Sequence, residues 1–164
     1  SARELSGVDW LVAGTERGTA EPTTTFSALF GAPFMALHPT VYADLFGKLI
    51  AAHDVDCWLV NTGWTGGAYP EGERIRIAYS RALVRAATSG ALTGVPFTRD
   101  PVFGFEVPRQ CPGVPDALLR PRDTWSDPSA YDAKADELAK LFTANFAAYA
   151  DQATPEVRAA GPLM

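Results

Sequence analysis

The segment GAYPEGER, from Gly67 to Arg74, has the glycine spacing of a phosphate-binding P-loop. A working P-loop cradles phosphates with backbone N–H groups, reaches the outer phosphates with a lysine and holds Mg²⁺ with a following hydroxyl. Here Glu73 occupies the lysine position, no hydroxyl follows it, and Pro70 removes one N–H donor. The spacing therefore supports a P-loop only weakly. An ordinary glycine-rich turn and a different kind of nucleotide site are the alternatives.

Arg74 is the residue of this segment whose chemistry suits an anion. It follows a flexible glycine loop, and its planar guanidinium can bind phosphate or carboxylate. A solvated strand arginine is the simpler alternative. His38 and His53 stand at the two ends of one predicted helix, so they cannot form a ligand pair. No residues have the spacing of a metal site or of a serine nucleophile elbow. Glu16-Arg17 is either a functional pair or, as the simpler alternative, an exposed local ion pair.

The composition is that of an ordinary soluble globular protein. Of 164 residues, 47% are hydrophobic and 20% charged, and the net charge is −5. This charge disfavours general attraction to nucleic acid or to an anionic membrane, and no apolar run is long enough to span one. We expect Cys57 and Cys111 to be buried thiols of a cytoplasmic protein. The length predicts a single domain over residues 1–164.

Three helices are predicted from the sequence. The first runs from His38 to His53, the second from Tyr79 to Gly90, and the third from Pro128, capped by Asp127, to about Tyr149. Each has apolar residues at helical spacing. Those residues are Val41, Leu45, Leu49 and Ala52 in the first helix, Ala82, Leu83, Ala86 and Ala87 in the second, and Tyr131, Ala135, Leu138, Phe142 and Phe146 in the third.

Short strands complete a predicted α/β fold, a mixed sheet with flanking helices. Strands are expected at Cys57–Val60, which should be buried, at Glu73–Ile77, and as extended segments within Val95–Pro108. A short helix is expected near Pro115–Leu119. The apolar stretch Phe26–Leu37 is predicted to lie in the core. The polar stretch Ala13–Thr25 is predicted to be a loop, and residues 150–164 a loosely packed tail.

Several long motifs in order resemble one known family. They are AGTERGTAEPTTTFSALFGAPFMALHPTVYADL, WLVNTGWTGGAYPEGERIRIAYSRALV, CPGVPDALLRPRDTW and ELAKLFTANFAAY. Together they look like the C-terminal third of ATP-dependent phosphoenolpyruvate carboxykinase. That family converts oxaloacetate and ATP to phosphoenolpyruvate, CO₂ and ADP with Mg²⁺ and Mn²⁺. The resemblance implies the C-terminal part of a mononucleotide-binding domain, with the P-loop and the metal ligands on an N-terminal part outside this chain.

The resemblance also implies which residues meet the nucleotide. Arg74 and Ile75 match an Arg-Ile pair that contacts ATP, with the arginine near the phosphates. Ser80 stands where the family has a threonine on the nucleoside side, so the hydroxyl is kept and the methyl is lost. Residues 13–25 resemble the mobile lid of the active site. The chain alone is expected to be inactive. A stand-alone nucleotide- or anion-binding module and an interaction module are the alternatives.

Overall fold

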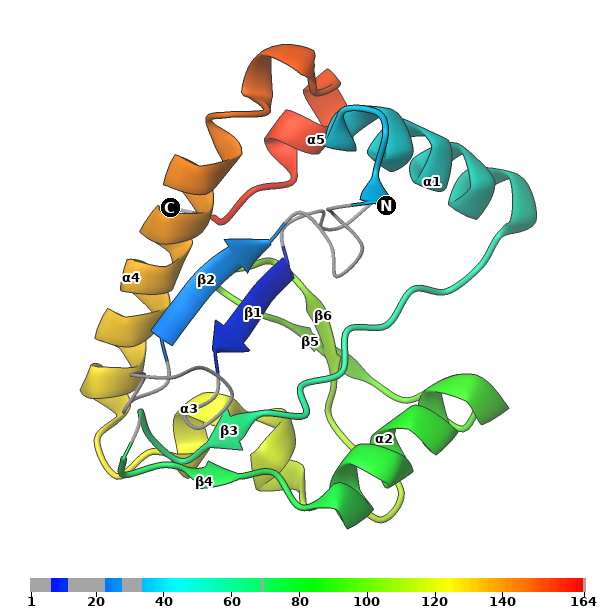
Figure 1. Cartoon of the computed structure of the whole chain (residues 1–164). Coiled ribbons are helices and arrows are strands. Elements are labelled where there is room, and N and C mark those ends of the chain that lie inside the picture. The colour runs from blue at the N-terminus through cyan, green and yellow to red at the C-terminus, as the bar shows by residue number, and fades with distance from the viewer. Residues whose placement is uncertain (1–6, 12–22, 28–33, 69, 164) are drawn as a thin grey trace. The chain divides into compact units, whose positions relative to one another are not determined.

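The computed structural model describes residues 7–11, 23–27, 34–68 and 70–163, and Figure 1 shows the helices and short strands that they form. The chain divides into two compact units. One comprises residues 1–56 and 140–162, and the other comprises residues 57–139 with 163 and 164. The long helix α4, Pro128–Phe146, begins in the second unit and ends in the first.

The first unit contains one antiparallel strand pair and several helices. Strand β1 (Gly7–Leu11) pairs with β2 (Thr23–Ser27), and the helical segments are α1 (Pro39–His53), η3 (Ala150–Gln152) and α5 (Pro155–Ala159). Part of the predicted loop, residues 13–22, lies outside the described residues. Residues 23–25 belong to β2 and not to a loop, because β-branched threonines favour extended backbone.

Helix α1 begins where the sequence predicts. His38 is its N-cap, and Nδ1 of His38 lies 3.4 Å from the Thr40 N–H, which donates to it. Pro39 occupies the first helical position, where its missing N–H costs no helical hydrogen bond. His38 therefore serves as the cap of this helix.

The predicted apolar face of α1 is exposed. Val41, Leu45 and Leu49 are 49%, 55% and 48% exposed, whereas Ala43 is buried. The core placement predicted for Phe26–Leu37 is wrong at Phe34 and Leu37, which are 91% and 58% exposed. Apolar composition identifies residues that favour burial, but the described part of this chain leaves about half or more of each of these side chains uncovered.

The second unit contains two further strand pairs and the helices that connect them. Strand β3 (Trp64–Thr65) pairs with β4 (Glu73–Arg74), and β5 (Phe97–Arg99) pairs with β6 (Glu106–Pro108). Helix α2 (Ile77–Ser89) follows β4. The short helices η2 (Asp116–Leu119) and α3 (Pro121–Thr124) precede α4. The expected short helix near residues 115–119 and the expected extended segments after residue 95 are confirmed.

The mixture of helices and strands is confirmed, but the single mixed sheet is not. The described strands form three separate antiparallel pairs. Residues 57–60 form no strand, Cys57 is exposed, and Leu59 is 65% exposed. A strand needs a neighbour to satisfy its backbone groups, and no described segment pairs with this one. The predicted strand at 73–77 stops at Arg74, because α2 begins at Ile77.

A small core holds α2 in place within the second unit. Ala86 packs with Leu92, Cys111, Val114 and Leu119, and Trp58 lies partly buried against them. The predicted inner residues Ala82 and Leu83 also contact this core. Gly90 ends the helix as predicted, with a φ of 74° that suits glycine. The prediction of a buried thiol holds for Cys111, whose pKa is raised by burial.

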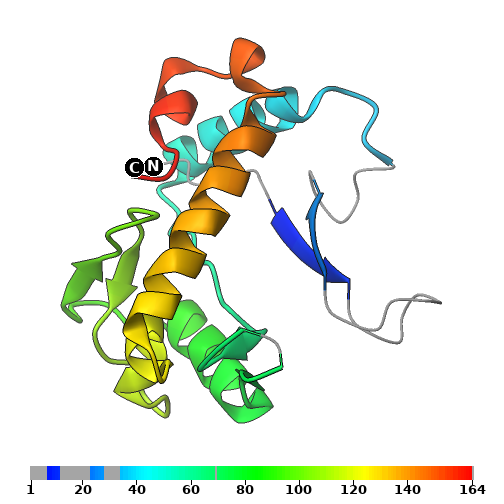
Figure 2. The same ribbon diagram turned by 90° about the vertical axis from the view of Figure 1, so that its left-hand side faces the viewer.

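Helix α4 is continuous (Figure 2), and Asp127 caps its N-terminus. The Asp127 carboxylate accepts hydrogen bonds from the Ser129 N–H at 2.8 Å and the Ser129 hydroxyl at 2.6 Å. The predicted stripe is buried or half-buried at every position, which confirms it. The helix ends at Phe146, three residues before the predicted end.

The C-terminal tail carries ordered elements. Thr154 caps α5, where its hydroxyl accepts from the Val157 N–H at 3.4 Å. The Arg158 side chain donates to the Ala153 carbonyl at 3.0 Å, and the Leu163 N–H donates to the Val102 carbonyl at 2.7 Å. The loose packing predicted for residues 150–164 remains a prediction.

Candidate functional site

A tight turn joins β3 to β4, and we call its residues 66–68 and 70–72 the glycine turn. The N–H groups of Glu71 and Gly72 both donate to the Ala68 carbonyl, at 2.8 and 2.9 Å. A Cβ on Gly72 would lie 2.2 Å from the Gly67 carbonyl oxygen. Only glycine permits this approach of two backbone segments, so the spacing of Gly67 and Gly72 has a structural cause.

The described N–H groups of Gly66, Glu71 and Gly72 in the glycine turn are not arranged as the donors of a P-loop. The N–H groups at Glu71 and Gly72 are already bonded within the turn, and the Gly66 N–H donates to the Thr124 hydroxyl at 3.1 Å. A phosphate cradle needs several such groups free and pointing to one centre. The geometry, like the sequence, therefore gives little support to a P-loop.

Arg74 and Ile75 follow the glycine turn and differ in exposure: Arg74 is exposed, and Ile75 is buried. Arg74 is exposed at the end of β4, opposite Trp64 in the strand pair. Ile75 is only 9% exposed, and its N–H donates to the Gly63 carbonyl at 2.8 Å. A buried, hydrogen-bonded residue directly after Arg74 fixes the backbone from which the guanidinium extends.

Ser80 lies in the first part of α2, on the element that directly follows Ile75. Arg76 is the N-cap of this helix, and its carbonyl accepts from the Ser80 N–H at 3.2 Å. Ser80 is half-buried and lines a shallow hollow together with Arg81, Val84 and Arg85. The predicted residues thus lie on one short continuous stretch of chain, from β4 into α2.

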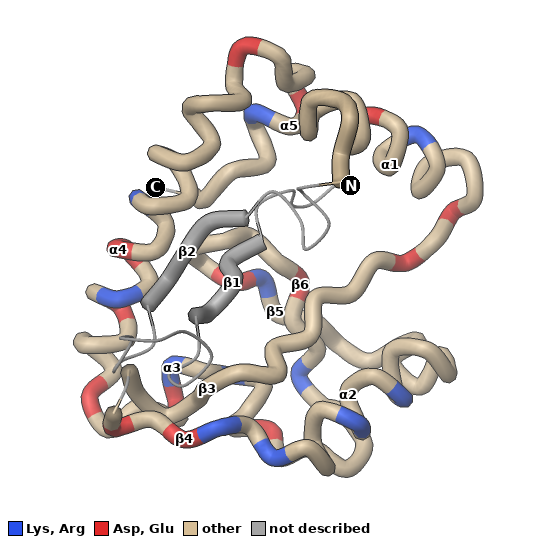
Figure 3. The backbone as a smooth tube through the Cα atoms, viewed as in Figure 1, with Lys and Arg blue, Asp and Glu red and all other residues tan. Residues whose placement is uncertain are grey.

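Four arginines follow this stretch, and we call them the β4–α2 arginines. They are Arg74, Arg76, Arg81 and Arg85, all exposed. Figure 3 shows the corresponding positive positions on β4 and along α2. None of them has an ion pair with the described residues, whereas Lys48, Arg120 and Lys134 each pair with a carboxylate. An anion in contact with these guanidinium groups would find them uncompensated.

Thr124 is a residue of this region that the sequence reasoning did not single out. It ends α3 and lies beside the glycine turn, 58 and 59 residues along the chain from its partners Gly66 and Thr65. Its hydroxyl lies 3.1 Å from the Thr65 hydroxyl and 2.6 Å from the Pro121 carbonyl. The RDTW sequence signalled the family resemblance but not this contact.

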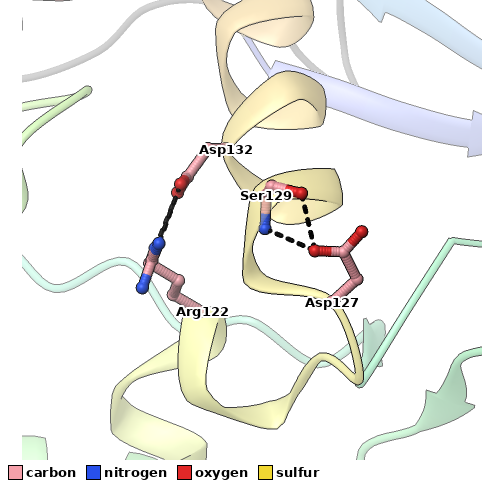
Figure 4. Close-up of polar contacts among 4 residues, drawn as sticks. All are labelled: Arg122, Asp127, Ser129 and Asp132. Atoms are coloured by element: carbon pink, nitrogen blue, oxygen red, sulfur yellow. Dashed lines mark hydrogen bonds and ion pairs between the residues drawn. The ribbon is translucent and has the colours of Figure 1, made fainter.

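An ion pair ties α3 to α4 (Figure 4). Arg122 donates through Nε and Nη2 to the two carboxylate oxygens of Asp132, at 2.7 and 2.9 Å. This hydrogen bonding lowers the pKa of Asp132 and raises that of Arg122. Both side chains are about half exposed, so the pair orients the helices more than it stabilises the fold.

The other chemical candidates do not converge. His38 and His53 lie at opposite ends of α1, about 22 Å apart along a helix of this length. Among the described residues, no three His, Cys, Asp or Glu side chains are grouped as metal ligands. Glu16-Arg17 lies outside the described residues. In the same described part, no helix is both long and apolar enough to cross a membrane.

Comparison with known proteins gives a consistent result. A family model described as phosphoenolpyruvate carboxykinase matches residues 4–117. Phosphoenolpyruvate carboxykinase (ATP) of Thermus thermophilus is 57% identical over 96% of this chain, and that of Parvibaculum lavamentivorans is 56% identical over 96%. A Salinibacter ruber relative is 56% identical over 98%. The chain spans only about 30% of the length of these relatives.

Proposed function

Because the chain belongs to the phosphoenolpyruvate carboxykinase family, we propose that it forms the nucleotide-binding C-terminal part of an ATP-dependent member. The intact enzyme would convert oxaloacetate and ATP to phosphoenolpyruvate, CO₂ and ADP in the cytoplasm. The use of ATP is supported by the relatives, which are phosphoenolpyruvate carboxykinases (ATP). In this proposal the whole chain, residues 1–164, is a single domain, and residues 13–25 act as its lid.

The observation that carries the proposal is Arg74 at the end of β4, which is exposed and has no ion pair with any described residue. Its guanidinium would bind the phosphates of ATP and stabilise the charge that builds up during phosphoryl transfer. Ile75 and Ser80 would contact the nucleoside. The charge of the β4–α2 arginines favours a polyanionic ligand over a neutral one.

The metal ions would be held elsewhere in the enzyme. Mg²⁺ and Mn²⁺ need several converging oxygen or nitrogen ligands, and the described residues contain no such group. In this proposal those ligands lie on the N-terminal part, which is the main partner of this chain. The chain alone would bind nucleotide without turning over substrate.

Titration of the 164-residue chain with ATP tests the proposal. Arg74→Ala should weaken binding about 10- to 100-fold, since hydrogen bonds to charged groups contribute about 1.5–3 kcal/mol. Arg74→Lys should lose less, because it keeps the charge. Lys134→Ala, which removes one exposed cation from α4, should leave the affinity within about twofold of wild type. Equal affinities for wild type and Arg74→Ala would reject the assignment of Arg74.

A second experiment concerns activity. The chain supplied with ATP, Mn²⁺ and oxaloacetate should form no phosphoenolpyruvate, and any turnover by it would contradict the proposed division of the site. A non-catalytic anion-binding module is the second candidate, and it is favoured by the β4–α2 arginines, which have no ion pair in the described part of the chain. In that case inorganic tripolyphosphate should bind as tightly as ATP, whereas a nucleotide site should prefer ATP.

A further inference from the structure

Thr124 has a hydroxyl whose hydrogen-bonding capacity is fully used. A threonine hydroxyl has one proton to donate and two lone pairs that accept. At 2.6 Å from the Pro121 carbonyl, which can only accept, Thr124 donates its proton there. It therefore accepts from the Gly66 N–H and from the Thr65 hydroxyl, both at 3.1 Å. Three groups from two distant segments meet at one oxygen atom.

These contacts fix the start of the glycine turn. Thr65 lies in β3 opposite Glu73, and the neighbouring Trp64 lies opposite Arg74. A bond to Thr65 and Gly66 therefore acts on the strand pair that carries Arg74. A Cβ on Gly66 would lie 3.5 Å from the Thr124 carbonyl oxygen, so the two backbones are already in close approach.

Helix α3, which carries Thr124, is itself held in place by α4. Thr124 and Arg122 lie in the same short helix α3, and the paired hydrogen bonds of Arg122 to Asp132 hold that helix to α4. A continuous series of contacts thus runs from α4 through α3 and Thr124 to the glycine turn and β4.

We propose that Thr124 is a positioning residue, which orients Arg74 for its anionic ligand by holding the glycine turn. This inference rests on the proposed function for the identity of the ligand, but not for the contact itself. The hydroxyl is the group that matters. Serine should replace threonine, whereas valine, which has the same shape without the hydroxyl, should not.

The test compares Thr124→Val with Thr124→Ser in the 164-residue chain. In Thr124→Val we expect hydrogen exchange of the Gly66 amide to accelerate about 3- to 10-fold, from the loss of one hydrogen bond. The Arg74 amide resonance should shift, and the dissociation constant for ATP should rise by a similar factor. Thr124→Ser should stay within about twofold of wild type in both measurements.

Two further variants keep the result unambiguous. Thr88→Val makes the same change in α2, where the hydroxyl bonds only to carbonyls of its own helix, and should leave Gly66 and ATP binding unchanged. If Thr124→Val does not fold, Thr65→Val removes one of the two donors to Thr124 and should shift the Arg74 amide in the same direction.

The outcomes separate the two proposals. If the wild-type chain does not bind ATP, the proposed function fails, and the Gly66 and Arg74 amides still decide the role of Thr124. Unchanged exchange at Gly66 and an unchanged Arg74 resonance in Thr124→Val would overturn the inference, whatever the ATP affinity. Equal disturbance by Thr124→Ser would also overturn it.

Discussion

At the scale of single residues, the pair Glu73–Arg74 explains how the proposed anion site can contain a carboxylate. Successive side chains of a strand point to opposite faces, so Glu73 and Arg74 in β4 extend in opposite directions. Arg74 shares its face with Trp64, its partner across the strand pair. The acidic residue at the lysine position of a P-loop therefore does not neutralise the arginine beside it.

Asp127 provides a prediction about pH. Hydrogen bonds from the Ser129 hydroxyl and then the Ser129 N–H hold the pKa of this carboxyl below its usual value. A lowered folded-state pKa gives stability that is present above the unfolded pKa of about 3.9 and is lost as pH falls through the folded value. Asn also caps helices but does not titrate. We therefore expect the stability difference between wild type and Asp127→Asn to shrink between pH 5 and pH 3.

Urea unfolding of both proteins at pH 7, 5 and 3 measures this difference. All other carboxyl groups titrate in both proteins and cancel in the comparison. Ser129→Ala removes the largest cause of the lowered pKa and should flatten the pH dependence. A gap between wild type and Asp127→Asn that stays constant over this pH range would show that the cap does not depend on the charge.

At the scale of elements, the glycine turn is the connection that tolerates the least change. A Cβ on Gly72 would meet Gly67 O at 2.2 Å, Gly67 C at 2.9 Å and Thr65 O at 3.1 Å, all of them backbone atoms. Gly72→Ala must therefore open the turn, at a cost of about 1–3 kcal/mol for an overpacked site. We expect lower thermal stability and weaker ATP binding, because the β3–β4 pairing that carries Arg74 would be lost.

Gly161→Ala is the matched control for this prediction. Its added Cβ would have only one neighbour, the Arg158 carbonyl oxygen at 3.9 Å, and should leave the melting temperature within about 1 °C of wild type. Calorimetry of the three proteins is sufficient. A Gly72→Ala protein that melts with the wild type would mean that the close approach of Gly67 and Gly72 is relaxed in solution.

The helices could be predicted from the sequence because their boundaries are local. His38 with Pro39, Asp127 with Pro128, and Gly90 each act within one turn of helix. The strand expected at 57–60 could not be judged locally, because a strand exists only where a second strand pairs with it. Trp58 still packs on the core there, so its apolar character was informative although its backbone state was not.

In the candidate site, too, the sequence could indicate residues that are close in the chain but not contacts between distant ones. Arg74, Ile75 and Ser80 lie within one short stretch, so ordered motifs could mark them as candidates, and their roles remain a proposal. Thr124 acts across 58 and 59 residues of chain, and no local pattern reports such a contact. The closure of the glycine turn on itself was also out of reach, since spacing alone does not tell whether N–H groups face a ligand or a carbonyl.

At the scale of the whole molecule, the exposed apolar side chains favour contact with another protein surface. Phe34, Leu45, Phe46 and Leu59 are 91%, 55%, 50% and 65% exposed. Apolar surface contributes about 25 cal/mol per Å² when it is removed from water, so such residues favour association. The relatives are about three times longer than this chain, so their additional length could supply a covering surface.

The exposed apolar side chains of α1 predict how the chain behaves alone. We expect sedimentation velocity to show association that increases with concentration in the tens of micromolar range. Replacing Leu45 and Leu49, which are 55% and 48% exposed on α1, with glutamine should shift the chain towards monomer without loss of thermal stability. Leu141→Gln, at a 40% exposed position on α4, tests whether any exposed leucine has this effect. A wild-type chain that stays monomeric throughout would show that the α1 face does not drive association, and would direct the search for a contact surface to the other exposed side chains.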